Sequence, residues 1–146
     1  MDLKNWEKIE KIANSKIKMK FYLIGKFSTR ETIGKHIDEL ESLGHTCTHN
    51  WTKKENYSAP KSDQVYYDLM GVTNAEFVAA VIDNPNYHYR GSFAEIGCAL
   101  GQGKRVHLIT NNCEKGSVTH CFLSHKNIIK FTTWEGFIDY VKSTQS

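Results

Sequence analysis

The alternation of short apolar segments with helical segments is the feature that most constrains the fold of this chain. Apolar runs typical of strands cover residues 17–25, 45–51, 76–82, 105–110 and 127–131. Helical patterns cover residues 28–44, 62–75, 93–100 and 133–143, and the loop before the last strand has room for a short helix. Such alternation predicts a parallel sheet with helices on both faces. Right-handed crossovers then favour the strand order 2-1-3-4-5 in a single-domain α/β, Rossmann- or flavodoxin-like fold.

The helix expected at residues 28–44 has the clearest boundaries in the sequence. Ser28 followed by Glu31 matches a capping box, in which the two side chains bond to backbone N–H groups at the start of the helix. Gly44 suits the left-handed position that ends a helix. The apolar face of this helix consists of Ile33, Ile37, Leu40 and Leu43. After a long polar loop, Ser62 is expected to cap the next helix.

Length, charge and hydropathy indicate one soluble domain with no nucleic-acid or membrane partner. The 146 residues suit a single core, and 40% of them are hydrophobic and 24% charged. The net charge is +3, but the lysine-rich residues 1–16 fit a solvated helical extension better than a basic nucleic-acid surface. No apolar run approaches the roughly 18 residues of a membrane span, and the N-terminus has no signal-peptide core. The protein is therefore expected to be cytoplasmic.

The cysteines and histidines form no recognisable metal site, and no cofactor is expected. The chain has four cysteines without a CxxC pair, which are expected to be free thiols: Cys47, Cys98, Cys113 and Cys121. A zinc site from Cys113, His120 and Cys121 is the alternative, but its spacing matches no common ligand pattern. Packing or one satisfied hydrogen bond explains the histidines in or beside the expected strands, which are His45, His49 and His107.

The unusual residues of the chain converge on one edge of the predicted sheet. Open parallel sheets bind ligands in the crevice beyond the carboxyl ends of their strands. Tyr22 lies on the first strand, Gly25 and Lys26 follow it, and Trp51 follows the second strand. The loop at residues 83–92 follows the third strand and leads into a helix. This edge is the expected binding site.

Glu95 is out of place in that helix, because the other side chains from Phe93 to Leu100 are apolar or small. We expect the carboxylate in the first turn, where the partial positive charge of the helix N-terminus would stabilise it. A purely structural role is one interpretation. The other is a catalytic carboxylate at the mouth of the crevice, ionised yet poorly solvated and therefore a good nucleophile.

Five segments together resemble the nucleoside 2-deoxyribosyltransferase family and its nucleotide N-glycosidase relatives. They are FYLIGKF at 21–27, YYDLMGV at 66–72, EFVAAVID at 76–83, RGSFAEIGCALGQGKRV at 90–106 and NIIKF at 127–131. The segment with Glu95 is the most specific, because it matches the family's run of small residues, glutamate, a hydrophobic residue and glycine. The resemblance covers residues 19–131. It implies a small-molecule nucleoside or nucleotide as the binding partner.

The resemblance also implies roles for individual residues. Glu95 matches the glutamate that attacks the anomeric carbon of the sugar, and Asp68 matches the aspartate that assists proton transfer and sugar positioning. Tyr22 matches a tyrosine whose hydroxyl contacts the nucleophile. Asn127 matches an asparagine that reaches the site of a neighbouring subunit, which implies a homodimer or a larger homo-oligomer.

The sequence departs from the transferases in the loop before Glu95. Tyr89 stands where transferases carry a base-binding aspartate and nucleotide hydrolases a phosphate-binding serine. Residues suited to hold a 5′-phosphate gather nearby: Lys26, Arg30, Arg90, Gly91 and Ser92. A solvated surface charge is the favoured alternative for Lys26 and for Arg30, whereas Arg90, one turn before Glu95, is the strongest candidate. Trp51, Tyr87 and Tyr89 are interpreted equally as a stacking wall for the base and as packing residues.

These observations predict an enzyme that cleaves the N-glycosidic bond of a nucleotide or nucleoside, with water as the usual acceptor. It would resemble a 2′-deoxynucleoside 5′-monophosphate N-hydrolase. One alternative is a nucleoside deoxyribosyltransferase. An alternative of another class is a sensor domain that binds a nucleotide or NAD derivative without turnover.

Overall fold

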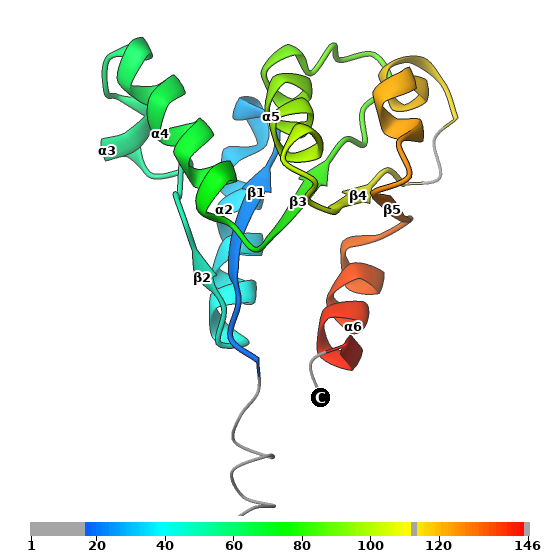
Figure 1. The fold of residues 1–146 in the computed structure, drawn as a ribbon. Coiled ribbons are helices and arrows are strands. Elements are labelled where there is room, and N and C mark those ends of the chain that lie inside the picture. Colours follow the sequence, from blue (N-terminus) through cyan, green and yellow to red (C-terminus); the bar gives the residue numbers. More distant parts are fainter. Residues whose placement is uncertain (1–16, 112–113, 145–146) are drawn as a thin grey trace, which may run out of the picture.

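A five-stranded parallel sheet forms the centre of the protein, as the sequence predicts. The computed structural model describes residues 17–111 and 114–144. The strands are β1 (Lys20–Ile24), β2 (Thr46–Cys47), β3 (Phe77–Val81), β4 (Val106–Ile109) and β5 (Ile128–Phe131). All neighbouring strands are parallel and the order is β2-β1-β3-β4-β5, which confirms the predicted topology (Figure 1).

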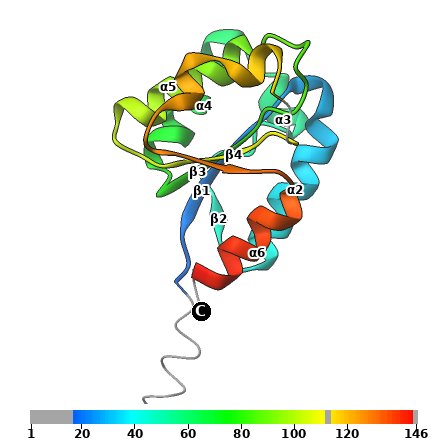
Figure 2. The same cartoon turned by 90° about the vertical axis from the view of Figure 1, so that its right-hand side faces the viewer.

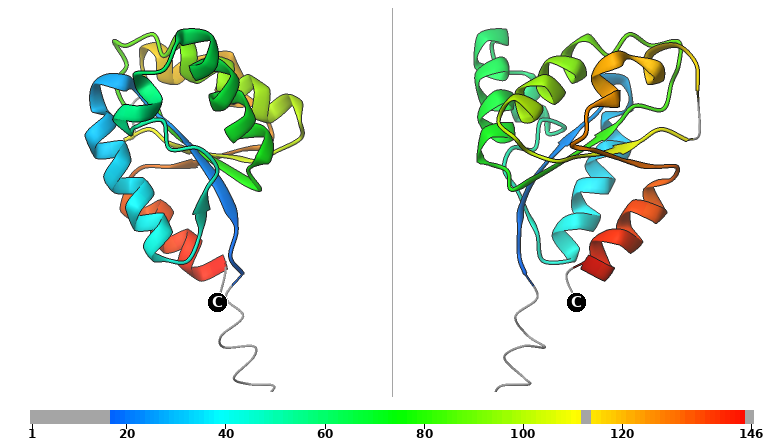
Figure 3. Two further views of the ribbon diagram at one scale, coloured as in Figure 1. Left: turned by 90° about the vertical axis from the view of Figure 1, so that its left-hand side faces the viewer. Right: turned by 45° about the vertical axis from the view of Figure 1, so that its right-hand side comes forward.

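Helices cover both faces of this sheet. They are α2 (Arg30–Ser42), α3 (Lys54–Tyr57), α4 (Lys61–Asn74), α5 (Arg90–Gly101) and α6 (Trp134–Thr144). Three short 3₁₀ helices complete the fold: η1 (Phe27–Thr29), η2 (Gly116–Thr119) and η3 (Cys121–Ser124). Helices α4 and α5 pack on one face, and α2 and α6 on the other (Figures 2 and 3).

Two apolar cores, one on each face, explain why the strands are almost continuously hydrophobic. In β1, Tyr22 and Ile24 face the α4–α5 side, whereas Phe21 and Leu23 face the α2–α6 side. A strand buried on both faces needs apolar residues at every position. Phe137 and Val141 of α6 are buried and complete the second core.

Two expected helix caps are wrong. Ser28 lies inside η1 rather than at the cap of α2, whose N-cap is Thr29 without a side-chain hydrogen bond. The predicted capping box therefore does not form, because the chain first makes a 3₁₀ turn in which Thr29 bonds to the carbonyl of Lys26. Ser62 is likewise already within α4, which begins one residue earlier after Pro60. Proline fixes an extended entry into the helix without a capping side chain.

The second strand and the polar loop after it also differ from expectation. Strand β2 has only two residues. Thr48 follows it directly, and its hydroxyl donates hydrogen bonds to the carbonyl oxygens of Phe21 and Gly71. Part of the loop at residues 52–61 folds as α3. This short helix brings its side chains over the carboxyl edge of the sheet.

Helix α5 begins earlier than the apolar pattern suggests. It starts at Arg90, so Glu95 lies in the second turn and not in the first. The helix is also not apolar and buried on all sides, because Gly91 and Ala94 are exposed. The helix has an outward face of small residues and an inward face that carries Glu95 towards the sheet edge.

Two contacts fix α4 against the sheet. Gly71 allows α4 to approach closely, because a Cβ atom there would lie 2.7 Å from the ring of Tyr22 and 2.9 Å from His49. Lys104 donates hydrogen bonds of 2.5–2.7 Å to the carbonyl oxygens of Val72, Thr73 and Ala75 at the end of α4. Lys104, from the Gly-Lys pair in the segment at 90–106, thus caps the C-terminus of α4. Its ammonium bonds to carbonyl groups that have no partner within that helix.

The remaining sequence-based expectations have mixed outcomes. His45 and His107 are buried and each makes one backbone hydrogen bond, which fits the packing interpretation. The expected N-terminal helical extension lies outside the described residues. No helix in residues 17–111 and 114–144 is long and apolar enough to cross a membrane.

Candidate active site

A cavity of about 310 Å³ opens at the carboxyl edge of the sheet, at the place that the topology predicts. Its walls come from the ends of β1 and β2, from α3 and α4, and from the start of α5. The lining residues are Gly25, Lys26, Phe27, Trp51, Asn56, Tyr57, Gln64, Asp68, Tyr87, Tyr89, Arg90, Gly91, Ser92 and Glu95. The volume lies within the range of about 300–1,000 Å³ that is usual for small-molecule sites.

Two carboxylates, Glu95 from α5 and Asp68 from α4, share this cavity. Burial, followed by the charge of Asp68, raises the pKa of Glu95 to about 8. Burial also raises the pKa of Asp68, to about 6. Since removing a carboxylate from water disfavours its charged form, the pair holds a proton at neutral pH. Carboxyl groups with raised pKa values in a cleft are typical of acid–base and nucleophilic sites.

Tyr22 lies beneath the two carboxylates. Its side chain is fully buried, and burial and then the charge of Glu95 raise the pKa of its phenol. The hydroxyl lowers the pKa of both carboxyls, so it lies close to each of them. Among the described residues, however, no partner meets it in full hydrogen-bond geometry. Hydrogen bonds at catalytic sites are often incomplete until a ligand binds.

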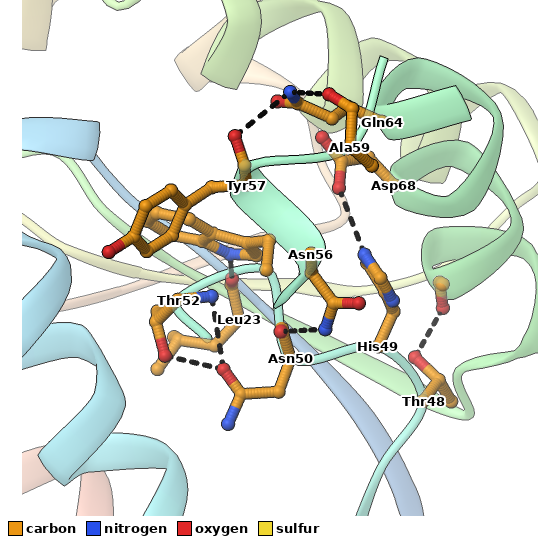
Figure 4. A network of polar contacts seen from close by, with 12 residues as sticks. Leu23, Thr48, His49, Asn50, Thr52, Asn56, Tyr57, Ala59, Gln64 and Asp68 are labelled. Carbon is orange, nitrogen blue, oxygen red and sulfur yellow. Dashed lines mark hydrogen bonds and ion pairs between the residues drawn. The ribbon is translucent and has the colours of Figure 1, made fainter. Parts of the chain in front are cut away.

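His49 contacts Asp68 from the side opposite the cavity. Its Nε2 lies 3.5 Å from the Asp68 Oδ1, and its ring stacks on Tyr67. Burial lowers the pKa of His49, so the neutral imidazole orients the carboxyl rather than forming a strong ion pair. The ring stack and the single polar contact fit the expectation of packing or one satisfied hydrogen bond. The sequence could not reveal the contact, because it depends on how α4 crosses the end of β2 (Figure 4).

The N-terminus of α5 forms another wall of the cavity. The N–H of Phe93 bonds to the carbonyl of Tyr89, so it is already used within the helix. The N–H groups of Arg90, Gly91 and Ser92 precede the first possible partner within the helix. All three residues line the cavity. The geometry is that of an anion site at a helix N-terminus.

Tyr89 shapes this helix start rather than forming an open stacking surface. It is 2% exposed and adopts a left-handed conformation with φ 53°. Its hydroxyl accepts a hydrogen bond from the Asn84 N–H and donates one to Asp83. The left-handed conformation costs a bulky residue energy, and burial together with these bonds offsets the cost.

The basic residues expected around a phosphate do not all reach the cavity. Lys26 lines it, with the ammonium 4.8 Å from the ring centre of Tyr87. Arg30 does not line it. Its guanidinium stacks on the rings of Phe27 and Tyr57 instead. Arg30 therefore supports the aromatic wall and was wrongly assigned to the phosphate.

Aromatic rings and two amides line the part of the cavity next to α3. The indole of Trp51 donates a 2.7 Å hydrogen bond to the carbonyl of Leu23, which fixes the plane of the ring. The rings of Phe27 and Tyr57 meet edge to face. The side chains of Asn56 and Gln64 also line this part of the cavity. The sequence carries no signal for Asn56, because residues 52–61 have the polar composition of an irregular loop, and none for Gln64, which is one of several polar residues in the predicted helix at 62–75.

Asn127 is the one predicted site residue far from the cavity. It directly precedes β5 and its carbonyl accepts the N–H of Val106 at the start of β4. Asn127 is therefore at the amino edge of the sheet, opposite Glu95. Its role in the site of a neighbouring subunit stays a prediction.

The described residues contain no cluster of three or more His, Cys, Asp or Glu side chains that could hold a metal ion. Cys113, a member of the alternative zinc site, lies outside them. Cys47, Cys98 and Cys121 are free thiols.

Comparison with known proteins supports the fold. No protein-family model matches the chain, and no curated protein gives a significant match. The structure of the Clostridium botulinum CMP N-glycosidase BcmB is similar, with a TM-score of 0.59. The match covers 86% of this chain and 98% of that chain, at 17% sequence identity. The chain therefore shares the fold of a nucleotide N-glycosidase.

Proposed function

We propose that this protein cleaves the N-glycosidic bond of a nucleotide or nucleoside. The observation that carries the proposal is the pair Glu95 and Asp68, whose pKa values are raised by burial in one cavity. An oxocarbenium-like transition state needs a carboxylate beside the anomeric carbon and a proton for the leaving group. The fold shared with a CMP N-glycosidase gives further support.

In the proposed mechanism Glu95 is the nucleophile. The pKa of Glu95 is the higher of the two, so at rest the shared proton lies mainly on Glu95. It must first pass to Asp68, which leaves Glu95 ionised and Asp68 able to donate. Its carboxylate oxygen bonds to the anomeric carbon as the bond from that carbon to the base nitrogen breaks. The base leaves with the electron pair and takes a proton that Asp68 supplies. Water then attacks the anomeric carbon and passes its proton to the carboxylate of Asp68. The bond from that carbon to the Glu95 oxygen breaks, which releases the sugar or sugar phosphate and returns the carboxylate of Glu95. Tyr22 is the positioning residue, because its hydroxyl lies close to both carboxylates.

Hydrolysis, base exchange and binding without turnover predict different products. Incubation with nucleosides and their 5′-monophosphates, followed by chromatography, would show free base in stoichiometric amount with free sugar for a hydrolase. A deoxyribosyltransferase would release little base until a second base is added. A sensor would bind the nucleotide and release none. Release of no base from any nucleoside or monophosphate would exclude the proposed function.

Arg90 is expected to select monophosphates over nucleosides. It lines the cavity at the N-terminus of α5, where backbone N–H groups and the helix dipole also favour an anion. Arg90→Ala should therefore lose roughly 1.5–3 kcal/mol of kcat/KM for the monophosphate, the range for hydrogen bonds to charged groups, and little for the nucleoside. High salt should weaken the preference of the wild type.

The matched control for this prediction is Arg105→Ala. Arg105 is also exposed but precedes β4, at the amino edge of the sheet away from the cavity. Its replacement should leave both kcat/KM values unchanged. Equal losses for monophosphate and nucleoside in Arg90→Ala would instead make Arg90 a structural residue.

Self-association is a further expectation, and α4 offers a surface for it. Large apolar side chains on this helix are 37–59% exposed: Val65, Tyr66, Tyr67, Leu69 and Met70. Monomeric proteins rarely expose so many together. Sedimentation should show a dimer or larger oligomer at micromolar concentration, and Val65→Glu should shift it towards monomer.

Thr32→Glu is a suitable control for Val65→Glu, because Thr32 is exposed on α2, on the other side of the sheet. This variant should associate like the wild type. A wild-type chain that is a fully active monomer at micromolar concentration would contradict the expected oligomer.

A further inference from the structure

The amide of Gln64 is locked in one orientation at the wall of the cavity. Its nitrogen donates to the carbonyl oxygens of Tyr57 at 3.0 Å and of Ala59 at 2.6 Å (Figure 4). A carbonyl oxygen only accepts hydrogen bonds, so the NH₂ group and not the oxygen must face this pair. Both hydrogens of the nitrogen are thereby used. The free polar atom of Gln64 is its oxygen, which can only accept.

Asn56 is fixed by one such bond rather than two. Its side-chain nitrogen donates a 2.6 Å hydrogen bond to the carbonyl of Asn50. The side-chain oxygen of Asn50 in turn accepts from the N–H and the hydroxyl of Thr52. Asn56 thus points its own oxygen away from the carbonyl that fixes it. Among the described residues, no hydrogen bond uses the side-chain oxygen of Asn56 or of Gln64 as acceptor.

The amide of Gln64 lies one helical turn from Asp68, and the start of α5 lies one helical turn from Glu95. Gln64 precedes Asp68 by four residues in α4, so the two side chains share a helix face one turn apart. Gly91 precedes Glu95 by the same spacing in α5. The cavity therefore has an anion-binding end at α5 and an amide end at α3 and α4. Asp68 lies one helical turn from Gln64, and Glu95 lies one turn from Gly91.

The amide end suits a planar ring with hydrogen-bond donors on its edge. The rings of Phe27, Trp51 and Tyr57 line the cavity there and can stack on a base. A sugar beside the carboxylates, with its phosphate towards Arg90, leaves the base to meet the two amide oxygens.

We propose that Gln64, assisted by Asn56, selects bases that carry an exocyclic amino group over bases with a carbonyl at the same position. The amino group of cytosine or adenine donates to the amide oxygen. With uracil or hypoxanthine, the carbonyl oxygen of the base would face the side-chain oxygen of Gln64. Both atoms only accept hydrogen bonds, so both would lack a partner. Because neither hydrogen of the Gln64 nitrogen is free, this side chain cannot turn to donate. This inference rests on the proposed glycosidase function and names its substrate class.

Paired substrates test the selection directly. The wild-type protein is assayed with CMP against UMP and with AMP against IMP, each pair differing in the amino or carbonyl group. For any pair that is cleaved, kcat/KM for the amino member should be higher by about tenfold or more. Equal values, or a preference for the carbonyl member, would overturn the inference while leaving the glycosidase function intact.

Gln64→Met tests whether Gln64 carries the selection, because methionine keeps the size but has no amide. Cleavage of the amino member should fall by about tenfold or more, and cleavage of the carbonyl member should fall much less. The control is Gln102→Met on α5, whose amide bonds to Thr73 and Cys98 outside the cavity. It should leave the ratio unchanged. Equal losses on both members in Gln64→Met would show that the amide only supports the loop.

Binding measurements separate this inference from the proposed function. Calorimetric titration of the wild type and of Glu95→Gln with the same four nucleotides does not require turnover. Tighter binding of CMP than UMP, or of AMP than IMP, without any release of base would support the amide selection and reject the glycosidase. Binding of all four nucleotides with equal affinity, or of none, would reject the amide selection.

Discussion

Glu95→Gln should lower kcat by on the order of 10³-fold or more on any nucleotide that the wild type cleaves. Glutamine has nearly the same shape as glutamate but cannot form the glycosyl ester. Because Glu95 lies in the second turn of α5 and glutamine fills the same space, the variant should keep the native structure. Release of free base, measured by chromatography with circular dichroism as the check on folding, decides the outcome.

The same variant has an expected signature in stability. The pKa of Glu95 is raised to about 8 in the folded protein, well above the value near 4.3 in an unfolded chain. A raised pKa favours folding fully below the unfolded pKa, and this contribution is lost as the pH rises towards the folded pKa. Wild-type Tm should therefore fall between pH 5 and pH 8 more than the Tm of Glu95→Gln.

Asp139→Asn on the exposed face of α6 is a matched control, because it also exchanges a carboxyl for an amide of nearly the same shape. Its Tm should follow that of the wild type at both pH values. A folded Glu95→Gln variant with nearly full activity would end the case for Glu95 as nucleophile. A loss of activity without the change in the pH dependence of Tm would mean that Glu95 is solvated and not buried.

The sheet could be predicted from the sequence because its physical cause is local. Strands buried on both faces must be apolar along their length, as in β1 and β3, and the order follows from the handedness of crossovers. The helix starts were harder. Ser28 is a good capping residue, but the chain leaving β1 needs a 3₁₀ turn first, and that need comes from tertiary structure rather than from the sequence of α2.

The candidate site likewise contains some residues that could be predicted from the sequence and others that could not. The positions of Glu95, Arg90 and Gly91 at the cavity could be predicted for two reasons. A carboxylate is unusual among the apolar and small residues that surround it in the sequence, and the N-terminus of a helix favours anions. Gln64 and Asn56 were not, since their side chains gain a direction only from the carbonyl groups that hold them. Arg30 was misplaced for a related reason: any surface arginine near the edge looks suitable until its stacking on Phe27 and Tyr57 is known.

Asp68→Asn is expected to have the second-largest effect, and to change the pH profile as well as the rate. Positioned proton transfer contributes about 10²–10⁴-fold, so kcat should fall by that order for substrates whose base leaves only with a proton. A 7-methylpurine nucleotide needs no such proton, because its cationic base leaves in neutral form. Its cleavage should fall much less and serves as the internal control.

The pH profile follows from the shifts of both carboxyls. The pair as a whole holds one proton between about pH 6 and about pH 8, the values to which burial raises the pKa of Asp68 and of Glu95. Such coupled values belong to the pair. Below this window both groups are protonated and no nucleophile exists, whereas above it no proton remains for the base. Wild-type kcat/KM should therefore be bell-shaped, with its maximum inside the window.

In Asp68→Asn the bell should become a single rising curve. No second carboxyl remains to lose its proton at high pH, so the alkaline limb disappears. Removing the charge of Asp68 also removes one cause of the raised pKa of Glu95, so the rise should occur at a lower pH than the alkaline limb of the wild type. An unchanged bell in this variant would assign the proton to another group, and the hydroxyl of Tyr22, close to both carboxyls, would then be the donor to test by Tyr22→Phe.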